Sequence, residues 1–516
     1  MQKKSITKVV FILSLVAVCL SAWVLDADAT GKRARAKHII LFVGDGMQLE
    51  HEIAASRYLF GKDTELSFHK LMYKGYVATW DVTTYNRYAL AAGLPSYTPA
   101  GFNPAVGYDP LKGGFKPYPA QTSPIDDAYF LTKLPLNPTD TPAQFRYPAT
   151  DSASAASAWA TGVKTDDGNI AWKPGDPSGG ALKTIAEVLR EQKGFSIGVV
   201  STVPFTHATP AAHVSHNVSR NNYTQIATEI IRTVQPEVVI GGGYPGDVGG
   251  ASAGFRYLGA VDYAFLKGSD STNPYVFIER QTGIDGSVSL LEAAHDAAEQ
   301  GKKLFGLFGG PGGNFESPVA YDFPGTPLIA RATIENPLLK DAALAALKVL
   351  SRDPDGFFVM VEQGDIDWSN HANDFQRMVG TTWDLHAAVE ATIDFINQPD
   401  DGVDWSNTLL IVTSDHSNSF MRLHADLTAG DLPAQVGSTY PDGEVSYRST
   451  EHTNELVMLY AQGAFHVSDF KKNEGRWYPC TRIIDNTQLY HLMAEAAGAP
   501  QASALSPAVE RPRTCN

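Results

Sequence analysis

The sequence predicts an α/β fold built on a large, mostly parallel central sheet. Short apolar runs rich in β-branched or aromatic residues recur along the 516 residues, and Gly, Asp or Ser bounds most of them. Buried parallel strands show this pattern because helices cover both of their faces. Segments with helical periodicity lie between the runs, and this alternation is typical of parallel sheets joined by crossover helices.

The expected elements alternate along the chain. Strands are expected at His38–Val43, Ser196–Ser201, Glu237–Ile240, Leu304–Phe308, Phe357–Val361, Thr408–Thr413 and Leu456–Tyr460. Helices are expected at Ala181–Lys193, Tyr223–Val234, Ser287–Gln300, Pro337–Ser351 and Phe375–Asn397. The small, Ala-rich segment 151–162 is expected to form one more helix, with Asp151 at its cap and Gly162 at its end.

The N-terminus is predicted to be a secretory signal peptide, residues 1–29. Three lysines precede an apolar run of twelve residues, Val9–Leu20, and Ala27-Asp28-Ala29 supplies a cleavage site. A membrane anchor is the alternative, but the run is short for a bilayer span. We therefore expect a secreted protein, periplasmic or extracellular, with no membrane span after cleavage.

Residues 30–516 are expected to form a single catalytic domain with one long insertion at about 85–147. This insertion is rich in Pro, Gly, Tyr and Thr and has no clear period. Loops of such length are usually functional or disordered. We expect it to run over the surface near the active face.

Charge limits the possible partners. The net charge of −15 disfavours binding to the nucleic-acid backbone. An anionic substrate must instead be captured by local positive charge from metals or arginine.

The mature chain would keep two cysteines, Cys480 and Cys515. In an oxidising compartment they favour a disulfide, and two independent thiols are the alternative.

Chemically active side chains follow the predicted strands. Ligands of open α/β sheets bind beyond the carboxyl ends of the strands. The residues found there are Asp45, His207, Thr209, Glu362, Asp367, His371, Asp415 and His416, and His452 precedes the last strand. Mixed His and Asp ligands suit a catalytic zinc site, and this set is large enough for two metals. Singly, an Asp after a strand is more often a helix cap.

Ser152 is the candidate nucleophile. It would lie in the first turn of the helix capped by Asp151, where free N–H groups and the helix dipole favour phosphate oxygens. A plain N-cap pair is the alternative. Ser154 and Ser157 lie on the same segment, and spacing alone does not exclude them.

Six ordered blocks of residues match one enzyme family. They are Phe42-Val43-Gly44-Asp45-Gly46-Met47, Asp151-Ser152-Ala153, Ala208-Thr209-Pro210-Ala211 with Ser219-Arg220, Val361–Asp367 with His371-Ala372, Thr413-Ser414-Asp415-His416, and Glu451-His452-Thr453. Over nearly the whole mature length the chain resembles alkaline phosphatases. The resemblance implies a three-layer α/β sandwich with surface insertions, and hydrolysis of small phosphate monoesters through a phosphoserine. It also implies a homodimer.

The resemblance further implies the role of each residue. Asp367, His371 and His452 would bind one zinc ion. Asp45, Asp415 and His416 would bind a second, with the Ser152 oxygen as its fourth ligand. Asp45, Thr209 and Glu362 would hold one magnesium ion. Arg220 would clamp two phosphate oxygens with its planar fork, and Asp151 would orient it.

Two positions near the expected phosphate site vary within this family. His207 stands where some members have Asp, and Trp368 where some have Lys or His. Trp368 either faces the phosphate, where its N–H can donate one hydrogen bond, or simply packs. A related phosphodiesterase or sulfatase is the second candidate, and an inactive metal- or phosphate-binding export protein is the third.

Overall fold

The computed structural model describes residues 35–121, 125–268, 271–398 and 402–499. The predicted signal peptide and Cys515 lie outside these residues. Cys480 is disulfide-bonded, and its pairing with Cys515 stays a prediction. No helix within the described ranges is both long enough and apolar enough to cross a membrane.

The centre of the molecule is a ten-stranded sheet in the order β16-β2-β15-β10-β1-β9-β3-β4-β6-β5. Only β15, which lies between β10 and β2, pairs antiparallel to its neighbours in this sheet. The predicted mostly parallel sheet is therefore confirmed. The strands are β1 (His38–Gly44), β2 (Tyr73–Ala78), β3 (Ser196–Pro204), β4 (Val238–Gly242), β5 (Tyr275–Glu279), β6 (Lys303–Leu307), β9 (Phe357–Gln363), β10 (Thr408–Thr413), β15 (Val457–Gly463) and β16 (Ile483–Asp485).

All seven predicted strands are present, with boundary shifts of a few residues. Sequence reasoning missed β2, β5 and β16. Two of these, β5 and β16, form the edges of the sheet, and most residues of β5 are only half-buried. The missed strand β16 is only three residues long, and β2 alternates buried and exposed positions at its start, so neither shows the long apolar run of a buried parallel strand.

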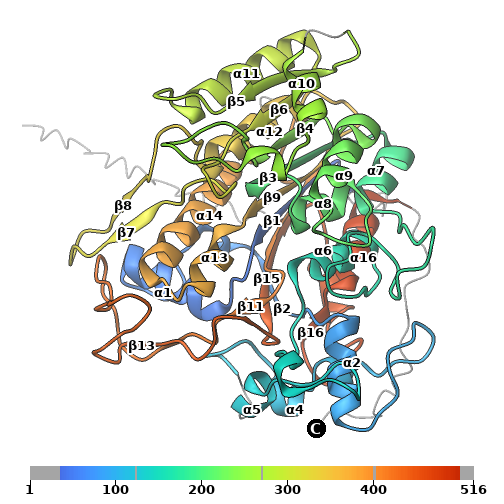
Figure 1. The fold of residues 1–516 in the computed structure, drawn as a ribbon, viewed down its shortest axis with the longest axis vertical. Coiled ribbons are helices and arrows are strands. Elements are labelled where there is room, and N and C mark those ends of the chain that lie inside the picture. Colours follow the sequence, from blue (N-terminus) through green and yellow to red (C-terminus); the bar gives the residue numbers. More distant parts are fainter. Residues whose placement is uncertain (1–34, 122–124, 269–270, 399–401, 500–516) are drawn as a thin grey trace, which may run out of the picture.

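Helices cover both faces of the sheet, so the three-layer sandwich is confirmed (Figure 1). One core lies under α6 (Ser152–Thr161), α7 (Ile185–Lys193), α8 (Ala208–Val214) and α16 (Thr487–Ala497). The other lies under α1 (Leu49–Phe60), α11 (Gly286–Gln300), α12 (Leu339–Leu350) and α14 (Phe375–Ile396). Alternate residues of β1 divide between the two cores, as the pleat requires.

The remaining elements are short. The helical ones are η1 (Ser67–Lys70), α2 (Val82–Ala91), α3 (Pro104–Gly107), α4 (Pro110–Gly113), α5 (Asp127–Leu131), η2 (Pro142–Gln144), α9 (Tyr223–Thr228), η3 (Glu229–Val234), η4 (Gly254–Arg256), α10 (Ala260–Lys267), α13 (Asp365–His371) and α15 (Val467–Lys471). The strands are β7 (Val319–Tyr321), β8 (Leu328–Ala330), β11 (Ser417–Asn418), β12 (Arg422–Leu423), β13 (Val445–Ser446) and β14 (His452–Thr453).

Helix starts differ from prediction where a cap decides them. The helix expected from Ala181 begins at Ile185, because Thr184 and Glu187 form a reciprocal capping box. The helix expected over Tyr223–Val234 continues beyond α9 as the π-helical turn η3. The helix at 151–162 follows the prediction closely: Asp151 caps it, and Gly162 ends it in the left-handed conformation with a φ of 76°.

The segment 85–147 holds more regular structure than its composition indicates. It includes most of α2 and the short helices α3, α4 and α5. Its aromatic side chains form a separate core with Trp80, Trp477 and Tyr478. Lys133 pairs with Glu451 at 2.9 Å, and the Asn454 amide donates to the Gly107 carbonyl at 2.8 Å. The segment therefore packs against the loop that carries His452.

A buried ion pair links the end of α6 to the sheet edge. The Lys164 ammonium lies 3.0 Å from Asp485, and both side chains are fully buried. Lys164 also donates to Asn486 at 2.7 Å and lies over the Trp80 ring. Removing one partner of such a pair leaves an uncompensated buried charge.

We expect Lys164→Met to destabilise the protein by about 3–5 kcal/mol, because Asp485 stays buried without its cation. The measurement is the guanidinium unfolding midpoint of the metal-loaded protein. Lys183→Met is the matched control, since Lys183 pairs with Glu191 on the exposed surface, and it should cost about 1 kcal/mol or less. Equal midpoints for the two variants would contradict this account.

Candidate active site

Three carboxylates converge at the carboxyl ends of the central parallel strands. Asp45 directly follows β1, Glu362 lies near the end of β9, and Asp415 follows β10 by two residues. Register places Val43 beside Glu362 on one side and beside Thr413 on the other. Because the three strands are parallel neighbours, their carboxyl ends bring these side chains to the same place.

Asp367, His371 and His452 form a group of side chains that could hold a metal ion, here called the first ligand group. Their ligand atoms all lie within 4.8 Å of one another. Asp367 and His371 are one turn apart on α13, and the His371 Nε2 atom lies 3.2 Å from an Asp367 oxygen. The helix α13 begins two residues after β9 ends, so it lies at the carboxyl end of that strand.

The histidine tautomers of this group follow from their second contacts. The Nδ1 atoms donate to backbone carbonyls, His371 to Thr450 at 2.6 Å and His452 to Thr150 at 2.9 Å. A carbonyl only accepts, so each Nδ1 carries the proton and each Nε2 points its lone pair inward. The two Nε2 atoms lie 3.1 Å apart, a spacing that needs a cation or a proton between them.

The neighbouring carboxylate favours the charged form of His371 in the metal-free protein. Burial opposes the charged form of His371, but the neighbouring Asp367 carboxylate outweighs burial and raises the pKa of His371 to about 9. Asn418 donates to the Asp367 carboxylate at 2.6 Å and fixes its orientation. Such outer contacts are typical of metal-binding histidines and carboxylates.

Asp45, Asp415 and His416 form the second ligand group, and it is fully buried. The His416 Nε2 atom lies 3.4 Å from Asp45 and 3.2 Å from Asp415. The His416 ring stacks on the His452 ring with centroids 3.5 Å apart, so the two groups adjoin. Gly46 lies between them with a φ of 67°, and a Cβ there would come within 2.7 Å of the Asp367 carboxylate.

Thr209 brings a third set of oxygens together with Asp45 and Glu362. All three side chains are buried. Four oxygens, Asp45 Oδ1, Asp415 Oδ2, Glu362 Oε1 and Thr209 Oγ1, have no hydrogen-bond partner among the described residues. Burial raises the pKa of Glu362 to about 7, and burial together with the neighbouring carboxylates raises the pKa of Asp45 well above its usual range. The donors present fit divalent cations: nitrogen and oxygen for zinc, oxygen alone for magnesium.

Ser152 lies against the second group. Its Oγ is 3.3 Å from the His416 Nε2 atom, at the N-terminus of α6. The other two candidate serines are engaged elsewhere: Ser154 donates to Asp81 at 2.8 Å, and Ser157 donates to the Asn169 carbonyl at 2.9 Å. Of the three serines, Ser152 is the one whose hydroxyl contacts a ligand group.

Asp151 links this helix start to Arg220. It accepts from the Ser154 backbone N–H at 2.9 Å and from the Arg220 guanidinium at 2.9 Å. Burial alone would raise the pKa of Asp151, but the Arg220 charge and the hydrogen bonds from Ser154 outweigh it and lower that pKa. The carboxylate therefore stays ionised and holds the arginine beside Ser152.

His207 and Trp368 lie at the rim in an aromatic stack. The His207 ring stacks on Tyr223 at 5.4 Å between centroids and on Trp368 at 6.5 Å. Burial lowers the pKa of His207 to about 3, and the charges of Arg220 and Arg256 act in the same direction. Sequence reasoning missed Tyr223, Tyr257 and Arg256, because they come from other segments and carry no motif.

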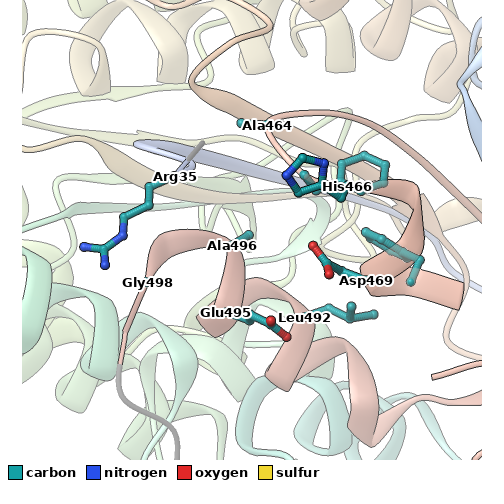
Figure 2. A pocket seen from close by; sticks show the side chains of 10 residues that line it. Arg35, Ala464, His466, Asp469, Leu492, Glu495, Ala496 and Gly498 are labelled. Carbon is teal, nitrogen blue, oxygen red and sulfur yellow. The ribbon is translucent and has the colours of Figure 1, made fainter. Parts of the chain in front are cut away.

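A separate cavity of about 660 Å³ lies at the other end of the strands from this site. Figure 2 shows the side chains that line it. Arg35 precedes β1 and Ala464 follows the antiparallel β15, whose last residue pairs beside Leu409 near the start of β10. The cavity is therefore at the amino ends of the parallel strands. It contains none of the predicted site residues.

We expect Asp45→Asn to have opposite effects with and without metal. In the metal-free protein it removes one of several buried like charges and should raise the melting temperature at pH 8. In the metal-loaded protein it removes a ligand, so the stabilisation by saturating metal, about 2.7 kcal/mol per site at 100 times Kd, should shrink. The measurement is thermal unfolding with chelator and with added zinc and magnesium.

Asp296→Asn on the exposed face of α11 is the control for that experiment and should change neither melting temperature. If Asp45→Asn lowers both temperatures equally, Asp45 serves a structural role and not a ligand role.

Known proteins resemble this chain in sequence and fold. The alkaline phosphatase family model matches residues 121–245 and 289–475. Alkaline phosphatase 3 of Bacillus subtilis is 32% identical over 279 residues, 54% of this chain and 51% of that protein. Alkaline phosphatase of Escherichia coli K12 is 28% identical over 388 residues, 68% of this chain and 74% of that protein.

The match to the two Bacillus subtilis relatives spans about half of their length. Among solved structures, the cold-active alkaline phosphatase of the psychrophile Shewanella sp. superimposes with a TM-score of 0.56 at 20% identity, covering 90% of this chain and all of that one. That likeness concerns the fold. Because the family model matches more than half of the residues, the chain belongs to the alkaline phosphatase family.

Proposed function

We propose that this protein is an alkaline phosphatase, which hydrolyses small phosphate monoesters to an alcohol and inorganic phosphate through a phosphoserine at Ser152. One observation carries the proposal. The Ser152 hydroxyl lies 3.3 Å from His416 at a helix N-terminus, with Arg220 held beside it by Asp151. This geometry supports the proposal because it brings a hydroxyl, a helix N-terminus and a guanidinium close together, and these would serve as nucleophile, anion-binding site and phosphate clamp.

We propose two zinc ions and one magnesium ion per chain as cofactors. The first zinc would be held by Asp367, His371 and His452, and the second by Asp45, Asp415 and His416 with Ser152. Asp45, Thr209 and Glu362 would hold magnesium. When bound, the metals supply Lewis acidity and lower the pKa of the oxygens that they contact. The inward Nε2 lone pairs and the unpartnered carboxylate oxygens support this assignment.

The chain's own residues would perform the positioning. Arg220 offers a planar fork that binds two phosphate oxygens, and its bond to Asp151 removes much of the entropy cost of ordering the side chain. The N-terminus of α6 adds backbone N–H groups and a favourable dipole for the anion. Ser152 forms the new bond to phosphorus while the alcohol leaves, and water then cleaves the phosphoserine and frees Ser152 again.

Three wider features of the proposal rest on the sequence alone. Export to the periplasm or medium follows from the predicted signal peptide, residues 1–29. A homodimer follows from the resemblance to the family. The acidic net charge favours small substrates over nucleic acids.

Ser152→Ala should lower monoesterase turnover by a factor on the order of 10³ or more, because the covalent intermediate cannot form. Acid quenching after brief turnover of labelled monoester should leave label on Ser152 in the native protein and none in the variant. Ser289→Ala on α11 is the control and should keep the native rate. Label recovered on Ser154 or Ser157 would refute the assignment of Ser152.

Chelation should abolish activity, and zinc plus magnesium should restore it, because the proposed reaction depends on the Lewis acidity of the bound metals. His371→Ala and His416→Ala should each lower the zinc content measured by mass spectrometry by about one ion per chain. His295→Ala on the exposed face of α11 should leave the metal content unchanged. Full activity in protein free of zinc would exclude the two-metal proposal.

A further inference from the structure

The rim of the candidate site presents one half-exposed tryptophan. Trp368 has 51% of its surface exposed, whereas Trp80, Trp159 and Trp477 are buried. Trp368 directly follows Asp367 of the first ligand group on α13. A large aromatic side chain open to solvent beside a catalytic centre is well placed to contact a substrate.

Trp368 contacts one end of a stack of rings, with its ring centroid 6.5 Å from that of His207. His207 lies between Trp368 and Tyr223, with its ring inclined by 30° to the first and 15° to the second. Tyr257 is buried and packs edge-on against both His207 and Tyr223. The Tyr257 hydroxyl donates to the Gly312 carbonyl at 3.1 Å. The stack is therefore held in place before any ligand arrives.

The two ends of this stack differ. At one end the Arg256 guanidinium lies over Tyr223 and Tyr257, 5.8 Å and 5.0 Å from their centroids. At the other end, His207 is the only ring that contacts Trp368 among the described residues. The stack is thus closed at Tyr223 and open at Trp368.

The stack borders the groups that would hold the phosphate. His207 stands two residues before Thr209, and Arg220 lies close enough for its charge to act on the His207 ring. Tyr223 lies close enough to act on Arg220 in turn. The alcohol part of a monoester must extend from the phosphate toward solvent, and Trp368 is the exposed apolar surface at that rim.

We propose that Trp368 forms a binding subsite for the alcohol part of the substrate and that this subsite selects monoesters carrying a planar aromatic ring. Such a ring would stack on the open face of Trp368 and lengthen the existing stack by one member. Aromatic pairs gain attraction beyond simple apolar burial, which a saturated ring of equal size does not. The inference rests on the proposed phosphatase function and names its substrate class.

The test compares 2-phenylethyl phosphate with 2-cyclohexylethyl phosphate on the metal-loaded enzyme. The two alcohols have the same linkage and nearly the same acidity, so leaving-group chemistry is matched and only ring planarity differs. The native enzyme should have a kcat/KM about two- to tenfold higher for the phenyl ester, the size of one aromatic contact. In Trp368→Leu this ratio should fall to about one, and Trp368→Phe should keep part of it.

Trp405→Leu is the matched control, since Trp405 is also partly exposed. Trp405 precedes β10, so it lies at the amino ends of the parallel strands, away from the candidate site, and its indole N–H donates to Asn397 at 2.8 Å. This variant should keep the native ratio. A ratio that is equal in the native enzyme and in Trp368→Leu would overturn the subsite.

A binding measurement separates this proposal from the proposed function. Phenylphosphonate and cyclohexylphosphonate are not hydrolysed, and their affinities for the metal-loaded protein can be measured by calorimetry. A preference for phenylphosphonate that disappears in Trp368→Leu supports the subsite even if neither ester is hydrolysed, a result that would refute the phosphatase function alone. Equal affinity of the native protein for both phosphonates overturns the subsite even if both esters are hydrolysed.

Discussion

The rest of the site depends on one constraint, which is the concentration of buried carboxylates at the carboxyl ends of the parallel strands. Burial raises the pKa of Asp45, and the nearby carboxylates of Asp415, Asp367 and Glu362 raise it further. Such a cluster is costly by itself, because each charge is desolvated and repelled by the others. Cations reverse the sign of these interactions. The fold therefore keeps an arrangement that is unfavourable by itself and that the proposed divalent metals would make favourable.

The sheet creates this concentration through its topology. Parallel neighbours β10, β1 and β9 end together, so residues distant in sequence meet without any local signal. Gly46 allows the chain to turn between the two ligand groups, where a side chain would collide with Asp367. The backbone carbonyls of Thr150 and Thr450 then set the histidine tautomers. The proposed metal ligands are thus oriented by the main chain as much as by one another.

Helix α6 supplies the opposite electrostatic feature. Its N-terminus carries partial positive charge, and Arg220 adds a full one through its bond to Asp151. Asp151 serves two purposes, since it caps the helix and orients the arginine. Its ionised state depends on Arg220, so the cap, the clamp and the position of Ser152 are coupled. The Lys164–Asp485 pair secures the other end of the same segment to the sheet edge.

Local sequence carried much of the fold and the residue types of the site. The buried strands were predictable because helices on both faces demand continuous apolar runs. The two ends of α6 were predictable because an N-cap Asp and a C-terminal Gly each act within a single turn. The edge strand β16 was not, since its three residues are too few to form a recognisable run. The folded character of 85–147 was also hidden, because its aromatic residues pack on Trp477 and Tyr478 from the far end of the chain.

The sequence by itself therefore determined which side chains are available: the carboxylates and histidines after the strands, Ser152 at a helix start, and Arg220 downstream. Only the tertiary structure decided which of them meet. It placed Ser152, and not Ser154 or Ser157, against His416, and it built the stack of Trp368, His207 and Tyr223 from three separate segments. The physical reason is that hydrogen bonds, ring contacts and ligand groups depend on distances of a few ångströms, which only the packing of the whole chain sets.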